Sequence, residues 1–401
     1  MKQKWLLGTL FFCVFLAWFT EVLLSPFYPQ FFRKVFGVED LSYTGYYIFI
    51  CRLTVVIASP LWGIIARWVS VKYLIYFGQL GSAIMTAMMA TATNENQFLW
   101  YTVVLLVLKS SYFLVYTLII QLAGESQRST VAGTYQAVSH GAIITSTIAG
   151  AWMIGWEAPL SLFYGVAIAD LIQLALCVYF LQGVETKPHK EPIPQETKLA
   201  TGKQQIGFIL AIGMAILTFQ LANNLIRPYF TEYVIAPEPF NISLLDSSIL
   251  FLIPSVMAIA ALPYIHFACK PHNLKQIYTF GMVLLVTSLF FQGWTNSLLF
   301  LILSRLVYGF FLAVTETVLQ LKLFNESSEN GIHFNYSVAA SFANVGRLGA
   351  PLAASWLVSS YNLAAPFLLA AIFSIANWIF AKFTIFQNKP NPKTLPPIPQ
   401  E

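Results

Sequence analysis

Twelve predominantly apolar stretches, each of about 20 residues or more, constrain the fold of this 401-residue chain more than any other feature. A helix of that length crosses the hydrocarbon core of a bilayer with every backbone polar group paired. We therefore predict an all-α polytopic membrane protein with twelve transmembrane helices. The stretches run approximately over residues 5–28, 42–66, 72–92, 99–121, 131–155, 158–181, 206–230, 244–268, 274–293, 297–321, 334–358 and 363–386.

The composition supports a membrane protein and argues against other classes. Only 10% of the residues are charged and 57% are apolar, whereas a soluble domain has about 25% charged residues. The basic residues are scattered, which argues against nucleic-acid binding. The four cysteines form no CxxC pair, and the chain has neither a phosphate-binding loop nor a catalytic cluster of motif strength. We expect no enzymatic activity, cofactor or metal site.

The first apolar stretch superficially resembles a signal peptide, because Lys2 and Lys4 precede an apolar run. It lacks a small-residue cleavage site and continues past Glu21 to Pro26, so we interpret it as an uncleaved first span. We expect Pro26, and Pro228 in the seventh span, to end their helices near the outer surface.

The polar segments divide the chain. We predict an N-terminal six-helix half over 1–182, a cytoplasmic linker over 183–205, a C-terminal six-helix half over 206–386 and a disordered cytoplasmic tail over 387–401. The linker is the longest polar interior segment and contains three prolines, and the tail is rich in proline.

The distribution of Lys and Arg predicts the orientation, because cytoplasmic loops are enriched in these residues. With both termini cytoplasmic, fifteen basic residues lie on the cytoplasmic side, against only Arg33 and Lys34 outside. We expect a multi-pass protein of the bacterial inner (plasma) membrane.

The two halves also repeat in sequence. Residues 21–28 match 223–230 at an offset of 202, and residues 60–78 match 263–281 at an offset of 203. Residues 106–112 match 302–308 at an offset of 196. Because both halves have six spans and the order is preserved, we predict a parallel repeat with a substrate site between the halves near mid-membrane.

On these features the chain resembles the major facilitator superfamily over essentially its full length. The loop pattern of that family, similar to G-x-L-A-D-R-x-G-R-K, reads GIIARWVSVK over Gly63–Lys72, with Arg67 at the acidic position. The charge-relay role of the family's aspartate at this position therefore does not carry over to this chain. Lys109 occupies the position of the family's fourth-span arginine, and the fifth span lacks the Gly-Pro motif of drug antiporters. The resemblance suggests exporters of carboxylate siderophores or metabolites.

Polar and charged residues inside apolar spans mark candidate sites, because a charge at the bilayer centre costs at least about 2.5–3.5 kcal/mol and usually faces a cavity or a partner. We take Glu21, Asp170 and Glu316 as candidates for proton coupling. The candidate substrate-binding residues, which lie in spans 2, 4, 7, 10 and 11, are Arg52, Lys109, Tyr112, Tyr116, Gln220, Asn223, Arg305, Tyr308, Asn344 and Arg347.

The alternative for each charged candidate is a structural ion pair, most simply Glu21 with Arg52. Counting favours an anionic substrate, because the spans hold five cations and three carboxylates, and an unpaired buried cation is costly. Arg227 weakens this argument if it reaches the outer surface. Lys109 and Arg305 occupy matching repeat positions, which predicts that an anion bridges them.

We therefore predict a monomeric secondary transporter that alternates access between its halves. It would export a small polar, anionic molecule in exchange for protons, with the lipid bilayer as its surroundings and no nucleic-acid partner. The alternatives are uptake of an organic anion by proton symport, multidrug efflux, and a non-transporting membrane sensor.

Overall fold

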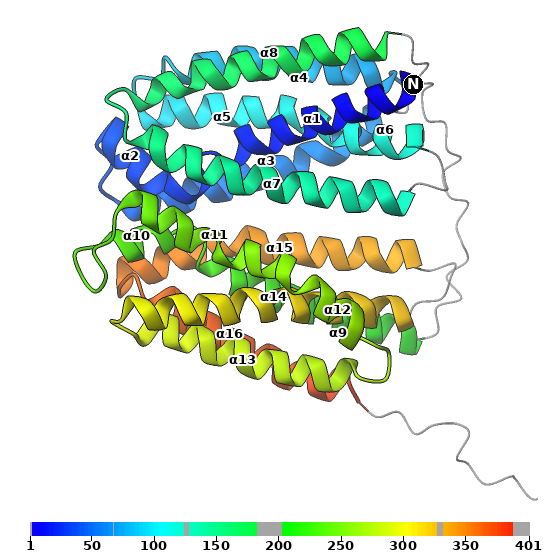
Figure 1. Cartoon of the computed structure of the whole chain (residues 1–401), viewed down its shortest axis with the longest axis vertical. Coiled ribbons are helices and arrows are strands. Elements are labelled where there is room, and N and C mark those ends of the chain that lie inside the picture. The colour runs from blue at the N-terminus through cyan, green and yellow to red at the C-terminus, as the bar shows by residue number, and fades with distance from the viewer. Residues whose placement is uncertain (1, 67, 124–127, 183–202, 327–331, 388–401) are drawn as a thin grey trace, which may run out of the picture.

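The computed structural model describes residues 2–66, 68–123, 128–182, 203–326 and 332–387. Arg67 of the loop pattern, nearly all of the predicted linker and the tail beyond Gln387 lie outside these ranges. The described part of the chain is helical, and its helices form two six-helix halves (Figure 1). The predicted fold class is confirmed.

The first half occupies one side of the molecule in Figure 1. Its six spans are built from α1 (Lys2–Val22), η1 (Ser25–Phe27) and α2 (Tyr28–Phe36); α3 (Leu41–Ile65); α4 (Val71–Met89); α5 (Glu95–Lys109), η2 (Ser110–Tyr112) and α6 (Phe113–Ala123); α7 (Arg128–Ile154); and η4 (Pro159–Ser161) with α8 (Leu162–Leu181).

The second half repeats this order and lies beside the first. Its spans are α9 (Lys203–Leu225) with α10 (Phe230–Ile235); α11 (Leu244–Ala260) with α12 (Leu262–Ala268); α13 (Leu274–Trp294); α14 (Leu298–Glu326); α15 (Ile332–Ser360); and α16 (Ala365–Thr384). Ten helical segments among the described residues are long and apolar enough to cross a membrane by themselves. The helices α4 and α15 are outside that set.

The first and seventh spans extend beyond their prolines, which corrects the predicted ends at 28 and 230. The apolar segments run over Trp5–Phe36 and Gly207–Ile235. Pro26 lies in the 3₁₀ turn η1, and Pro228 lies in the turn between α9 and α10. Proline lacks an N–H and kinks a helix without preventing its continuation. Glu21 therefore lies close to the middle of its span.

The two halves meet at the end of the molecule away from the N-terminus, where α2, α10 and α11 begin or end (Figure 1). The Tyr229 hydroxyl donates to the Leu41 carbonyl at 2.7 Å, and the Ser355 hydroxyl donates to the Ser42 carbonyl at 3.2 Å. Beside them, a Cβ on Gly45 would meet the Pro351 carbonyl oxygen at 2.7 Å, so α3 and α15 approach closely here. This end of the bundle is thus tightly closed.

Candidate functional site

A cavity with about 540 Å³ of empty space lies within the first half and contains Glu21 and Lys109. Glu21 projects from the last turn of α1, and Lys109 ends α5 immediately before the 3₁₀ turn η2. No hydrogen bond or ion pair from another described residue reaches the Glu21 carboxylate, although Lys109 lies near enough to attract it. The lining consists of Val14, Ala17, Trp18, Glu21, Val55, Leu106, Lys109, Ser110, Tyr112, Tyr116 and Tyr135.

Aromatic rings surround the carboxylate in this cavity, which we call the N-half cavity. The Trp18 indole N–H donates to the Tyr135 hydroxyl at 3.2 Å, and the rings of Tyr116 and Tyr135 lie 4.2 Å apart. The hydroxyl of Tyr112 is buried without a hydrogen-bond partner among the described residues. The cavity therefore combines one carboxylate with several π-faces.

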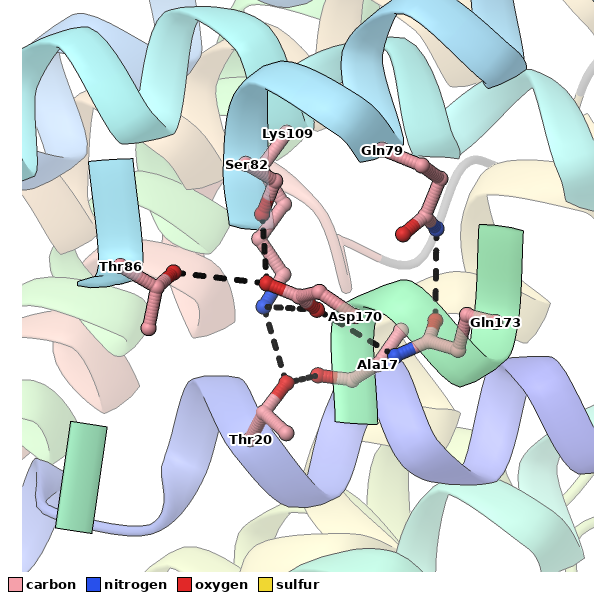
Figure 2. A network of polar contacts seen from close by, with 8 residues as sticks. All are labelled: Ala17, Thr20, Gln79, Ser82, Thr86, Lys109, Asp170 and Gln173. Carbon is pink, nitrogen blue, oxygen red and sulfur yellow. Dashed lines mark hydrogen bonds and ion pairs between the residues drawn. The ribbon is translucent and has the colours of Figure 1, made fainter. Parts of the chain in front are cut away.

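Lys109 and Asp170 belong to a buried polar network shown in Figure 2. The Lys109 ammonium donates to the Thr20 hydroxyl at 2.9 Å and lies 3.9 Å from the Asp170 carboxylate. Asp170 is fully buried and also accepts from Ser82 at 2.8 Å and from Gln173 at 3.3 Å. Because its oxygens face the interior of the half, Asp170 is placed to compensate Lys109 rather than to meet a substrate.

A second cavity, with about 550 Å³ of empty space that includes its opening to solvent, lies within the second half between α9, α14 and α15. We call it the C-half cavity. Gln220 donates to Glu316 at 2.8 Å and accepts from Arg347 Nε at 3.1 Å, while the Arg347 Nη2 atom lies 3.9 Å from Glu316. Asn344 lines the same cavity, together with the apolar surfaces of α14 and α15. The structure thus brings together four of the predicted site residues.

Three arginines approach one another between the halves, and we call them the arginine cluster. Arg52 of α3 donates to the Arg347 carbonyl at 2.6 Å, which links the two halves near mid-span. Arg227 and Arg347 lie close enough to Arg52 for their charges to repel it. Arg227 is an exposed side chain and has no hydrogen bond or ion pair within the described part of the chain. Arg52 is thus bonded to a backbone oxygen and not to Glu21.

The sequence predicts that Arg305 faces Lys109 across an anion, but the structure places Arg305 away from both cavities. Its side chain is only 4% exposed, and its nitrogens lie 3.3–3.4 Å from the Gln292 side chain and from the carbonyls of Leu250 and Phe251. Its guanidinium carbon lies 3.9 Å from the centre of the Phe230 ring. Arg305 therefore satisfies backbone and aromatic partners and lines neither cavity.

Two further predicted residues also lie beneath the cavity surfaces. The Tyr308 hydroxyl donates to the Asn223 side-chain oxygen at 3.1 Å, and both residues are buried. This contact joins α14 to α9 and so positions two of the helices that line the C-half cavity.

A polar connection at the closed end was missed by the sequence analysis. Gln30 donates to the Glu232 carboxylate at 2.8 Å, and Arg33 forms an ion pair with it at 2.6 Å. We call this connection, between α2 and α10, the closing contact. Gln30 and Glu232 are themselves related by the repeat offset of 202 that relates Glu21 to Asn223. That offset was the available signal, because repeat-related residues near the axis between two halves meet each other.

Neither the place of Tyr135 in the N-half cavity nor the proximity of Arg227 to the other two arginines was predicted from the sequence. Tyr135 lies in the fifth span, whereas the tyrosines selected from the sequence lie in the fourth and tenth spans. Arg227 was placed near the outer surface because the seventh span was ended at Pro228, whereas the helical segment continues to Ile235.

Comparison with known proteins agrees with this architecture. The profile of the Major Facilitator Superfamily matches residues 10–226 and 206–401. Multidrug resistance protein MdtG of Salmonella paratyphi C is 24% identical over 370 residues, with 90% of each chain covered. The MdtG protein of Serratia proteamaculans is 23% identical over 369 residues, covering 90% of this chain and 88% of the relative.

Solved structures show the same fold at lower identity. The nucleoside transporter NupG superposes with a TM-score of 0.74 at 17% identity, covering 96% of this chain and all of NupG. The human organic anion transporter MFSD10 gives a TM-score of 0.66 at 14% identity, covering 94% and 99%. Because the profile covers most of the sequence and the two halves match the fold, the chain belongs to the Major Facilitator Superfamily and is a multi-pass secondary transporter rather than an enzyme.

Proposed function

We propose that this transporter exports a small organic anion in exchange for protons, with the anion bound at the arginine cluster. The observation that carries the proposal is the proximity of Arg52, Arg227 and Arg347, where Glu316 is the carboxylate near the last two. Two positive charges are left over at this point of the described structure. Arg227 and Arg347 are both exposed, so an anion that enters between the halves can reach their guanidinium groups.

The cluster also joins elements from both halves. Arg52 belongs to the first half, and Arg227 and Arg347 belong to the second. An anion held by both sides interacts differently with the two conformations of a rocking transporter, which is the requirement for coupling binding to movement. The bidentate geometry of guanidinium groups suits carboxylates and phosphates.

Glu21 is the proposed proton-coupling residue, because it is the cavity carboxylate without a hydrogen bond or ion pair among the described residues. Asp170 and Glu316 are engaged by Lys109 and Gln220. A group that exchanges protons must reach the cavity water, and Glu21 lies there while Asp170 does not.

Counterflow in proteoliposomes tests the anion proposal. The panel consists of citrate, a carboxylate siderophore, uridine and ethidium, with Arg227→Gln and the surface variant Lys270→Gln as a control. We expect accelerated exchange for a carboxylate, a loss of about tenfold or more in its apparent affinity in Arg227→Gln, and no change in Lys270→Gln. If uridine or ethidium is exchanged and neither of the two anions is, the proposal is contradicted.

Glu21→Gln tests the coupling. It should abolish transport driven by a proton gradient and leave the counterflow of a purely anionic substrate such as citrate intact, because counterflow needs no net proton movement. Glu157→Gln, an exposed acid beyond α7, serves as the control. Proton-driven transport at the wild-type rate in Glu21→Gln would show that the carboxylate is not the coupling group.

Multidrug efflux is the second candidate function. It is favoured by the MdtG relatives, whose name states multidrug resistance, and by the aromatic lining of the N-half cavity. The excess of cations at the arginine cluster is the observation against lipophilic cations as the main substrates. Ethidium exchange that survives Arg227→Gln would support this second candidate.

A further inference from the structure

We infer that the substrate is amphoteric, with a cationic group that binds beside Glu21 among the aromatic rings of the N-half cavity and an anionic group that binds at the arginine cluster. The inference deepens the proposed function and rests on it for the anionic end. The cationic end stands on separate residues, all of them in the first half.

The chemistry of the N-half cavity is complementary to an organic cation. A carboxylate attracts an ammonium group, and aromatic faces attract it further through their quadrupoles, especially where water is excluded. Trp18, Tyr116 and Tyr135 supply these faces around Glu21. Because the Trp18 N–H is bonded to Tyr135, the two rings are held in place before a ligand arrives.

The nearby lysine does not cancel this preference. Lys109 attracts Glu21, but its ammonium is also held by Asp170 at 3.9 Å and by Thr20 at 2.9 Å. When Glu21 is ionised, two carboxylates and one ammonium leave this network of the first half with one negative charge. The arginine cluster with Glu316 has the opposite balance, so the two regions differ in sign.

The two regions adjoin each other through shared helices. Val55 lines the N-half cavity and Arg52 belongs to the arginine cluster, and they are three residues apart on α3. Three residues of helix correspond to about 4.5 Å along the axis. On α7, Tyr135 lines the same cavity, while His140 lies close enough to Arg227 to feel its charge. A ligand of modest length therefore reaches both regions.

A set of three dyes with similar ring systems tests the inference. Tetramethylrhodamine carries a cationic ring system and a carboxylate, its methyl ester carries only the cation, and fluorescein carries only negative charge. Their binding to the purified full-length protein is measured by fluorescence anisotropy. We expect the amphoteric dye to bind about tenfold more tightly than either of the others, as expected for one additional desolvated charge contact.

Two variants separate this inference from the proposed function. Glu21→Gln should remove the advantage of tetramethylrhodamine over fluorescein and leave fluorescein binding unchanged. Arg227→Gln should remove its advantage over the methyl ester. Glu157→Gln is the control for both. An unchanged ratio of tetramethylrhodamine to fluorescein in Glu21→Gln, or failure of the amphoteric dye to bind the wild type, overturns the inference. Unchanged fluorescein binding in Arg227→Gln contradicts the anion site itself.

Discussion

Charged side chains in apolar spans take three different roles in this molecule. Asp170 is compensated inside the first half, Arg305 rests on carbonyls and the Phe230 ring, and Arg227 faces the space between the halves. In all three cases the sequence shows only a charged residue inside an apolar span. The partners distinguish the three side chains. A charge that is already compensated needs no ligand, whereas an uncompensated charge favours one.

At the residue scale, we expect Asp170→Asn to destabilise the protein strongly. The substitution leaves the Lys109 ammonium without its buried carboxylate, and breaking a buried ion pair costs about 3–5 kcal/mol. The measurement is the thermal midpoint of the detergent-purified protein. The double variant Asp170→Asn with Lys109→Met removes both charges and should recover part of the loss. A double variant no more stable than Asp170→Asn would show that the ion pair is not the cause.

At the element scale, broken helices position the functional groups. The 3₁₀ turn η2 follows Lys109, and the turn η1 follows Glu21 by a few residues. The sequence indicates the break at η1 through Pro26, but η2 contains no proline. It does not predict how far the span continues afterwards, because that depends on the packing of the far end against the other half.

The crossing of α1 and α7 gives a prediction about packing. A Cβ on Gly150 would collide with the Leu23 carbonyl oxygen, whereas the space around Gly141 on the same helix is open. We expect Gly150→Ala to lower the free energy of unfolding by about 1–3 kcal/mol through overpacking. Gly141→Ala is the matched control and should be neutral or slightly stabilising. Equal thermal midpoints for the two variants would contradict the close crossing.

The closing contact gives a second prediction at this scale. Glu232→Gln removes the ion pair with Arg33, which is partly exposed, so the expected effect is only about 1 kcal/mol, or roughly fivefold in the opening equilibrium. The measurement is the rate at which an impermeant thiol reagent, added at the closed end, modifies a cysteine at Val55 in a background without native cysteines. Asp246→Asn, whose carboxylate bonds to Ser243 within its own helix start, is the control. An unchanged rate in Glu232→Gln would show that the contact does not close the cavity.

At the scale of the whole molecule, the sequence predicts the fold far better than the site. Twelve spans and a parallel repeat follow from hydropathy and internal matches, because lipid forces each span to be a helix. The site depends on which side chains meet between helices. The matching repeat positions of Lys109 and Arg305 predict that one anion bridges them, but the two halves pack different neighbours around them. Gln292 and Phe230 lie beside Arg305, whereas Asp170 and Thr20 lie beside Lys109.

The orientation in the membrane remains a prediction from the distribution of basic residues. We expect a cysteine at Gln195 in the predicted linker to resist an impermeant thiol reagent in intact cells, and a cysteine at Glu157 to react. Both are tested before and after permeabilising the cells. Labelling of Gln195→Cys from outside would reverse the predicted topology.

The joining of the halves at one end has a consequence for affinity. If the substrate site is reachable from only one face in the resting conformation, a ligand arriving at the other face meets mostly shut molecules. Its apparent dissociation constant is then the intrinsic constant divided by the fraction that is open on that side. The contacts of Glu232, Tyr229 and Ser355 stabilise the shut arrangement. The same binding residues would thus give two different half-saturation concentrations, a low one at the end with the termini and a high one at the closed end.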